Sequence, residues 1–277
     1  MAPRPGASGN ARGDGLGGPI ARGFSAFAGA AAEYGRVSDW IIPDWPAPSR
    51  VRALVTTRTG GVSVGPYASL NLAAHVGDDA AAVAENRRRL REQLPAEPCW
   101  LTQVHGVRVI DAQTESAGVE ADAAVANATG VVCAVLTADC LPVLLCDEAG
   151  TAVAAAHAGW RGLAGGVIEA TVEAMPAAPQ RLLAYLGPAI GPQAFEVGPE
   201  VREAFLAHSA EAALAFKAKG EGKFLADLYR LARQRLNALG VTRVFGGGRC
   251  TFLEAAHFYS YRRDQTTGRM ASLVWME

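Results

Sequence analysis

The sequence predicts a single α/β domain built on a mixed sheet. Of its 277 residues, 50% are hydrophobic and 19% are charged, which is enough apolar surface for one sizeable core. Short apolar runs with strand character mix with segments of helical spacing, but not in strict strand–helix–strand order. No linker composition interrupts the chain between Trp40 and Glu277. We therefore expect residues 38–277 to form one domain.

Residues 1–37 are expected to form a flexible N-terminal tail. They contain many small residues and no sustained hydrophobic periodicity, so they cannot bury enough apolar surface to offset the entropy of ordering. Their best apolar patch is too weak for the core of a secretory signal.

The elements of the first half begin with a buried strand at 51–58. A glycine-punctuated loop follows, and then residues 79–94 have the spacing of a helix, with Val83, Leu90 and Leu94 on one face. Four short apolar runs with strand character come next, at 108–112, 131–137, 142–147 and 151–157.

In the second half we expect three helices and three strands. The helices cover 165–175, 199–208 and 227–240, and the strands cover 181–190, 242–247 and 270–276. Gly240 stands where a helix commonly ends in a left-handed residue.

Charge and cysteine content exclude several classes of protein. The formal net charge is −1, which gives no general attraction for nucleic acid. No apolar run reaches the roughly 18 residues that a membrane span needs. The five cysteines are odd in number and form no C-x-x-C pair, so a disulfide framework is not expected. A reducing cytoplasm fits this cysteine usage, and the oligomeric state stays open.

Several common catalytic motifs are absent. There is no P-loop, no H-E-x-x-H and no Rossmann glycine fingerprint after a strand. The five histidines are far apart in the sequence and form no H-x-H pair, which counts against a multicopper centre.

Three residues that can bind metal stand at the ends of expected strands. His105 precedes the strand at 108–112, Cys140 follows the strand at 131–137, and His157 ends the strand at 151–157. Two histidines and one cysteine with an open fourth position are a known catalytic zinc set. A cysteine in an apolar stretch is more often a small buried hydrophobe, and a histidine at a strand end is more often structural. From spacing alone both readings stay open.

Polar residues near these three suggest anion and substrate contacts. Arg161 lies at the start of a helix after His157, where backbone N–H groups can receive a phosphate. Arg58 ends a strand before a glycine-rich loop, a second place for a phosphate. Asn71 is a hydrogen-bonding side chain in an apolar pattern. Each of them has an ordinary alternative as a solvated cation or a turn residue.

Two further features complete the candidate site. Asp122 precedes an apolar run and could orient a metal-bound histidine, or only cap a turn. Near the C-terminus, aromatic and arginine side chains that could stack on a nucleobase come together, namely Tyr259, Tyr261, Arg262, Arg263 and Arg269.

The order of motifs matches a known family. TTRTGGVS, QVHG, LTADCLPVLL, AAHAGWRGLAGG and FYSYRRDQTTGRMAS occur in this order between Val51 and Glu277. In this combination the chain resembles the bacterial laccase-domain family, also described as multicopper polyphenol oxidases and as peptidoglycan editing factors, with members of the bacterial purine nucleoside phosphorylase type.

The resemblance implies both a fold and a metal site. The fold is an α/β domain of stacked layers, distantly similar to the catalytic domain of a cytotoxic necrotizing factor. The metal site is zinc bound by His105, Cys140 and His157, with copper as the alternative metal.

The resemblance also implies an activity. It is phosphorolysis of adenosine, inosine or methylthioadenosine, together with deamination of adenosine. The partners are then purine nucleosides and phosphate, and not nucleic acid or a membrane. We expect Arg58, Asn71, Arg161 and Arg262 to contact these substrates.

Three other functions remain open at this point. Cys140 could be the nucleophile of a metal-free hydrolase or amidase in peptidoglycan editing, with His157 or His105 as its base. Alternatively, the protein could be a copper-dependent phenol oxidase. A non-enzymatic interaction module is the third alternative, although none of the three metal ligands has been lost.

Overall fold

The computed structural model describes residues 1–2, 39–115 and 117–277. The expected tail therefore lies outside the described residues, apart from Met1 and Ala2, and its boundary at residue 37 stays a prediction. The described residues from 39 to 277 belong to one compact unit. Within the described ranges, every helix is too short or too polar to cross a bilayer.

A six-stranded mixed sheet is the larger of two sheets at the centre of this unit. In spatial order its strands are β11 (Arg243–Gly246), β7 (Leu182–Leu186), β5 (Leu141–Asp147), β6 (Val153–Ala158), β3 (Ala123–Ala126) and β2 (Val109–Asp111). The outer pairs, β11 with β7 and β3 with β2, are parallel, and the inner pairs are antiparallel. The predicted α/β fold with a mixed sheet is confirmed.

The second central sheet is antiparallel and has three strands. They are β1 (Val51–Val55), β12 (Met270–Met276) and β4 (Cys133–Thr137), in that order. Both central sheets are covered on two sides, so their strands are apolar on both faces. In β5, for example, Leu144 packs between the two sheets while Val143 and Leu145 pack toward the helices.

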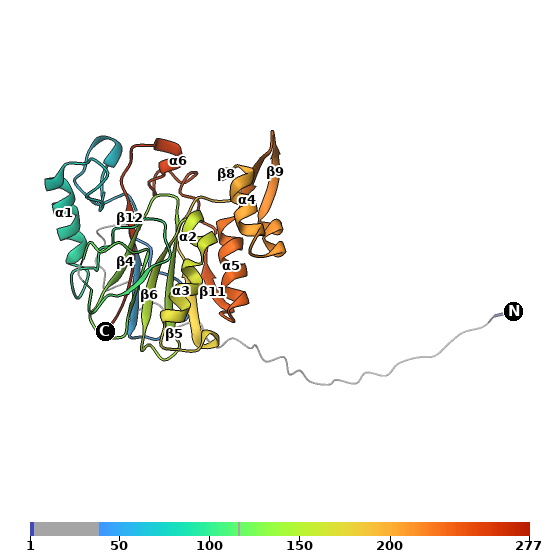
Figure 1. Ribbon diagram of the computed structural model, residues 1–277, viewed down its shortest axis with the longest axis horizontal. Coiled ribbons are helices and arrows are strands. Elements are labelled where there is room, and N and C mark those ends of the chain that lie inside the picture. Colours follow the sequence, from blue (N-terminus) through green and yellow to red (C-terminus); the bar gives the residue numbers. More distant parts are fainter. Residues whose placement is uncertain (3–38, 116) are drawn as a thin grey trace. The chain divides into compact units, whose positions relative to one another are not determined.

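Helices close the outer faces of the two central sheets (Figure 1). On the three-stranded side, α1 (Ala80–Arg91) packs Leu90 against Leu54 and Trp275. On the six-stranded side, the core contains residues of α2 (Trp160–Gly165), α3 (Val167–Ala174), α4 (Pro199–Leu206) and α5 (Leu228–Ala238). The result is a stack of helix, sheet, sheet and helices. The expected likeness to the cytotoxic necrotizing factor domain stays a prediction.

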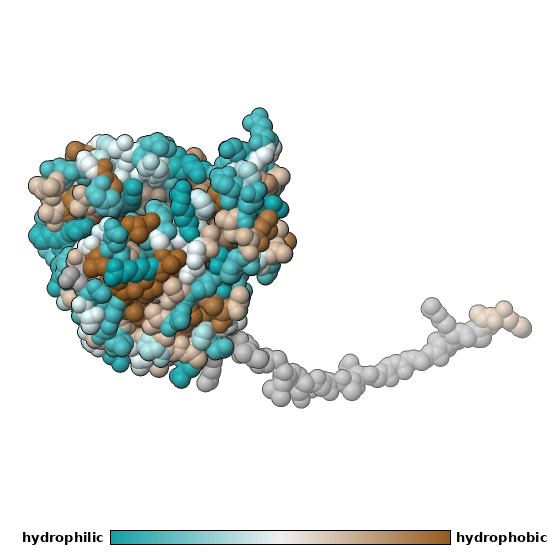
Figure 2. Space-filling model, in the orientation of Figure 1, coloured by the Kyte–Doolittle hydropathy of each residue, from teal (hydrophilic) through white to brown (hydrophobic). Residues whose placement is uncertain are grey.

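Smaller elements complete the described part of the chain. They are the sheet of β8 (Glu196–Val197), β10 (Lys223–Ala226) and β9 (Phe216–Gly220), the short helix α6 (Tyr261–Asp264), and the 3-10 turns η2 (Gly65–Tyr67), η3 (Pro179–Arg181) and η4 (Ala210–Ala215). On the face shown in Figure 2, hydrophobic residues gather in patches bordered by hydrophilic ones.

Most predicted elements are present, with shorter ends. The helix predicted at 79–94 is α1, and Val83, Leu90 and Leu94 are buried as expected. The helix predicted at 227–240 is α5, followed by Gly240 with a φ of 92°. The helix predicted at 165–175 is α3, which begins at Val167 because Gly166 has a φ of 104° and separates it from the preceding short helix α2.

The sequence analysis missed β3 and the sheet of β8, β9 and β10. The residues of β3 are mostly alanine, and β9 is rich in lysine and glycine, all of which are poor strand formers. The predicted strand at 181–190 ends earlier, at Leu186, because a glycine and a proline follow.

Candidate metal and substrate site

The pairing of β5 with β6 brings two candidate ligands to one end of the larger sheet. The strands are antiparallel, with Pro142 opposite His157 and Leu141 opposite Ala158. Cys140 immediately precedes β5, so it lies beside the residues that end β6. The start of one strand and the end of its antiparallel neighbour always share an edge of the sheet.

Pairing of β3 with β6 adds Asp122 to the same end. Ala123 lies opposite Ala156, so Asp122 lies opposite His157, whose backbone N–H donates to the Asp122 carbonyl at 2.7 Å. The loop before β2 carries His105, and β2 runs parallel to β3. Residues 35 positions apart in the sequence, Cys140 and His105, therefore become neighbours.

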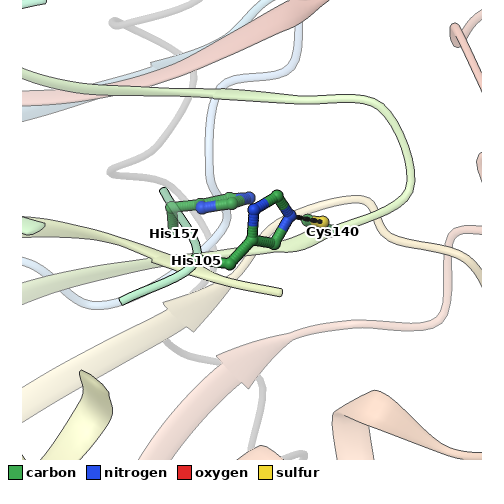
Figure 3. A group of neighbouring side chains, drawn as sticks. All are labelled: His105, Cys140 and His157. Carbon is green, nitrogen blue, oxygen red and sulfur yellow. Dashed lines mark hydrogen bonds between the residues drawn. The ribbon is translucent and has the colours of Figure 1, made fainter. Parts of the chain in front are cut away.

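His105, Cys140 and His157 point their side chains toward one another (Figure 3). Their ligand atoms all lie within 4.8 Å of one another, and Cys140 Sγ is 3.6 Å from His105 Nε2. The two imidazole rings meet edge to face, with centroids 4.8 Å apart. His157 is buried, Cys140 is half-buried and His105 is exposed, so the group is open to solvent from one side.

The carboxylate of Asp122 holds this group together. It is fully buried and accepts hydrogen bonds from the backbone N–H groups of Val104, His105 and Gly106, at 3.2, 2.9 and 2.6 Å. It also lies 2.8 Å from His157 Nδ1. A proton on Nδ1 donates to this carboxylate, which leaves the lone pair of Nε2 free for a ligand.

The charges around Cys140 favour its thiolate. Burial raises the pKa of this thiol, but the positive charge of His157 and the hydrogen bond with His105 lower it further than burial raises it. Burial lowers the pKa of His157, but the Cys140 thiolate and the hydrogen bond to Asp122 raise it above its ordinary value. The thiolate is the form of cysteine that binds metals and attacks electrophiles.

The residues fit a metal ion by their chemistry and spacing. Tetrahedral bonds of about 2.1 Å to nitrogen and 2.3 Å to sulfur place neighbouring ligand atoms about 3.5 Å apart. The separation of Cys140 Sγ and His105 Nε2 already matches this spacing. Among the described residues, the histidine, cysteine and acidic side chains that lie close enough in a group of three or more to hold a metal are those of His105, Cys140 and His157. A multicopper centre needs many more histidine ligands than this group supplies.

Gly159 leaves the space in which the ligands meet. A Cβ atom at this position would lie 2.8 Å from His105 Cδ2 and 2.9 Å from Cys140 Sγ, both closer than van der Waals contact allows. The backbone of Gly159 has a φ of −59°, which alanine adopts without strain. A side chain here therefore displaces the ligands without disturbing the backbone.

Replacing Gly159 with alanine is expected to weaken metal binding by about tenfold to a hundredfold, as when the outer partners of a metal site are lost. A competition titration with a chromogenic chelator measures the affinity. The matched control is Gly165→Ala on α2, whose Cβ would meet only the Val107 side chain, at 3.2 Å. Equal affinities for the two variants would contradict the prediction.

Asp139 fixes the turn that carries Cys140. Its φ of 92° is rare for a residue other than glycine. The carboxylate accepts hydrogen bonds from Thr251 Oγ1 and from the backbone N–H of Arg262, both at 2.6 Å, and its carbonyl accepts one from the N–H of Ile190. These bonds to three separate segments hold the strained turn and so set the position of the thiol.

A cavity of about 550 Å³ opens over the candidate metal group. This volume lies within the range of small-molecule sites. Two arginines expected at the site, Arg161 and Arg262, line it. Arg161 lies over the ring of Trp160, and Arg262 donates from Nη1 to the Glu196 carbonyl.

The other two expected substrate residues lie outside the cavity lining. Arg58 donates to the carbonyls of Ala68 and Ala255 and lies over the Tyr259 ring, so it connects loops. Asn71 is fully buried, and its amide is engaged by four hydrogen bonds, to Ala73 (twice), Asp78 and Arg269. The structure does not bring either side chain to the cavity.

The sequence analysis did not assign several residues of the lining to a site. They include His75, Gln103 and Trp160. Gln103 was part of a quoted motif, and Arg269 was noted only within the aromatic and arginine cluster. His75 comes from an irregular loop, where spacing carries no information about which side chains will converge. Tyr259 of that cluster is fully buried, whereas Tyr261 lines the cavity.

Comparison with known proteins gives a consistent family match. A family model described as multi-copper polyphenol oxidoreductase laccase matches residues 52–277. A purine nucleoside phosphorylase of Pseudomonas aeruginosa is 62% identical over 239 residues, which cover 86% of this chain and 98% of that protein. The purine nucleoside phosphorylase YfiH of Escherichia coli is 58% identical over 243 residues, which cover 87% of this chain and all of that protein.

Solved structures show the same fold. A protein from Neisseria meningitidis superposes with a TM-score of 0.84 at 55% identity, covering 87% of this chain and 100% of that one. YlmD from Geobacillus stearothermophilus gives a TM-score of 0.78 at 35% identity, covering 86% and 96%. The resemblance inferred from the sequence motifs is confirmed.

Proposed function

This chain belongs to the multi-copper polyphenol oxidoreductase laccase family, and from that premise we propose that it is a zinc-dependent purine nucleoside phosphorylase. Its substrates are adenosine, inosine and methylthioadenosine, and the same site deaminates adenosine. Relatives that are 52–62% identical over nearly their whole length are named purine nucleoside phosphorylases. The observation that carries the proposal is the convergence of His105, Cys140 and His157 under a cavity of suitable size.

In this proposal, His105, Cys140 and His157 hold the metal. When bound, zinc supplies a Lewis acid with an open coordination position at the floor of the cavity. A set of two imidazoles and one thiolate suits zinc and also suits copper, which stays the alternative metal. Asp122 keeps the Nδ1 proton of His157 in place, so that Nε2 faces the site.

Phosphorolysis breaks the bond between C1′ of the ribose and N9 of the purine. The bonding electrons leave with the purine, and a phosphate oxygen forms the new bond to C1′, through a state with oxocarbenium character. The cavity offers the guanidinium groups of Arg161 and Arg262 to attract and orient the phosphate. The rings of Trp160 and Tyr261 provide flat surfaces for the purine. In deamination, water replaces the amino group at C6 and ammonia leaves.

The proposal is tested by incubating the metal-loaded protein with inosine, with and without phosphate. We expect hypoxanthine and ribose 1-phosphate to form only when phosphate is present. Adenosine without phosphate is expected to give inosine and ammonia. Formation of free ribose at the same rate with and without phosphate would show a hydrolase and overturn the proposal.

A second function is favoured by one specific arrangement. Asp122, His157 and Cys140 form a chain of acid, base and thiolate, which is the order of groups in a cysteine hydrolase. An amidase acting on peptidoglycan precursors could use it without metal. Such a triad has no need for His105, whose backbone is nevertheless fixed against Asp122 with its ring beside the thiol. Turnover by chelator-treated protein, with covalent labelling of Cys140, would favour this alternative.

We place the protein in the cytoplasm in this proposal. All five cysteines are free thiols, although Cys99 and Cys133 lie on adjacent segments, and free thiols are typical of a reducing compartment. The partners are the nucleoside and phosphate, and the proposal includes no nucleic acid or membrane. A copper-dependent phenol oxidase would instead be recognised by its copper content and its optical absorption band.

A further inference from the structure

The lining of the cavity over the candidate metal group is rich in basic side chains. Three arginines (Arg161, Arg262 and Arg269) and three histidines are among its lining residues, and the described part of the lining contains no aspartate or glutamate. A cavity of this charge concentrates anions and binds them more strongly than open solvent does. The three arginines differ in their exposure to solvent and in the hydrogen bonds of their guanidinium groups. This difference identifies the arginine that is best suited to bind a phosphate.

Arg161 and Arg262 are exposed side chains at the rim. Arg161 rests on Trp160, and Arg262 uses its Nη1 on a backbone carbonyl. Exposed guanidinium groups are well solvated, so an anion must displace water to reach them and gains little from each contact. These two residues are therefore better suited to attract and orient a ligand than to bind a phosphate in one fixed geometry.

Arg269 is half-buried, lies over the Tyr261 ring and is held in one orientation by hydrogen bonds. Its Nη1 donates to the carbonyls of Thr267 and Gly268 at 2.9 and 3.0 Å, and its backbone N–H donates to Oδ1 of the buried Asn71. No carboxylate of the described residues lies within salt-bridge distance of it. Burial lowers the pKa of Arg269, while the negative charges of Cys140 and, more weakly, of Asp139 act in the opposite direction.

Removing a cation partly from water costs free energy, and without an acidic side chain beside it this cost is offset only when an anion binds. Among the described residues, Nε and Nη2 of Arg269 have no hydrogen-bond partner, and neither atom is sealed from solvent. These two donors form one edge of the planar guanidinium, which matches two oxygens of a phosphate. The carbonyls that accept from Nη1 fix the plane of the guanidinium before any ligand binds. The side chain therefore loses little conformational entropy when a phosphate binds.

His75 lies close enough to Arg269 to be affected by its charge. Burial, followed by the charges of Arg269 and Arg87, lowers the pKa of His75, so this imidazole is neutral at neutral pH. A neutral ring can donate one hydrogen bond to a phosphate oxygen without adding repulsion to the arginine. His75 also lines the cavity, although it comes from a different loop.

We propose that Arg269, assisted by His75, is the residue that binds the attacking phosphate, and that Arg161 and Arg262 serve only to attract and orient ligands. The proposal rests on the phosphorylase function proposed above. Asn71, expected to contact substrate, acts in it as a positioning residue that holds the backbone of Arg269.

The test is steady-state phosphorolysis of inosine with phosphate as the varied substrate, together with calorimetric binding of inorganic phosphate to the metal-loaded protein. Arg269→Gln is expected to raise the KM for phosphate by about tenfold to a hundredfold, the loss expected for a hydrogen-bonded charge pair. The KM for inosine should change little. Arg161→Gln and Arg262→Gln are expected to have smaller effects on the KM for phosphate.

The matched control is Arg233→Gln, which is expected to leave the KM for phosphate unchanged. Arg233 is also half-buried and donates to two backbone carbonyls, those of Val244 and Gly246, but it is outside the cavity lining. If Arg269→Gln fails to fold, Arg269→Lys tests the assignment instead, because lysine keeps the charge but cannot present two parallel donors. This variant too is expected to raise the KM for phosphate and weaken calorimetric binding.

The outcomes separate this proposal from the function on which it rests. A native protein that releases no hypoxanthine with phosphate present refutes the phosphorylase function itself. A phosphate-dependent native protein whose KM for phosphate is unchanged by Arg269→Gln, or raised more by Arg161→Gln or Arg262→Gln, refutes only the assignment of Arg269. A rise confined to the KM for inosine refutes it as well.

Discussion

Replacing Cys140 with alanine is expected to remove the bound metal and to abolish phosphorolysis. Cys140 supplies the one thiolate of the candidate group, and its Sγ is 3.6 Å from His105 Nε2. Two imidazoles without a thiolate bind zinc far more weakly, because three protein ligands are the usual minimum of a catalytic site. Loss of a direct ligand should cost more than the roughly hundredfold that loss of an outer partner can cost.

Elemental analysis of the purified variant and an inosine assay measure these two effects. Cys250→Ala is the matched control, because Cys250 is also half-buried but its sulfur accepts a hydrogen bond from the Gly191 N–H and lies outside the candidate metal group. We expect this control to retain its metal and its activity. Metal-replete Cys140→Ala protein with native turnover would contradict both the metal site and the cysteine-nucleophile alternative.

Replacing Asp122 with asparagine is expected to lower both stability and metal affinity. The carboxylate receives four N–H groups, three from backbone and one from His157 Nδ1. An asparagine has one carbonyl oxygen and an NH2 group, so at least one of these N–H groups then faces another donor. We expect a loss of about 3 to 5 kcal/mol in the free energy of unfolding, as when a buried charged partner is removed.

The loss of metal affinity has a separate cause. Without the carboxylate, the proton of His157 is no longer held on Nδ1, and the tautomer with a free Nε2 is less populated. Metal affinity should fall by about tenfold to a hundredfold. Urea unfolding of the metal-free protein and a chelator competition measure the two effects independently.

Asp111→Asn is the matched control for this prediction. Asp111 is an exposed aspartate at the end of β2 whose carboxylate accepts from Gln113. Because water can replace these contacts, its substitution should change stability only slightly. If Asp122→Asn were as stable as Asp111→Asn and bound metal normally, Asp122 would have no organising role.

Strong local patterns allowed much of the fold to be predicted. The amphipathic spacing of α1 and α5 and the continuous apolar runs of β5 and β12 identified those elements, because each follows from nearby residues. The alanine-rich β3 could not be recognised in this way. Its strand form comes from pairing with β6 and β2, which are distant contacts that outweigh weak local preference.

The amino-acid sequence by itself determined the family, the α/β class and which three residues could bind a metal, because residue type and motif order are properties of the chain. Only the tertiary structure decided the rest. Strand register placed Asp122 against His157. The packing of loops left Asn71 and Arg58 outside the cavity lining and brought Arg269 and His75 into it. Hydrogen bonds and burial depend on neighbours that lie far apart along the chain, and no local pattern specifies them.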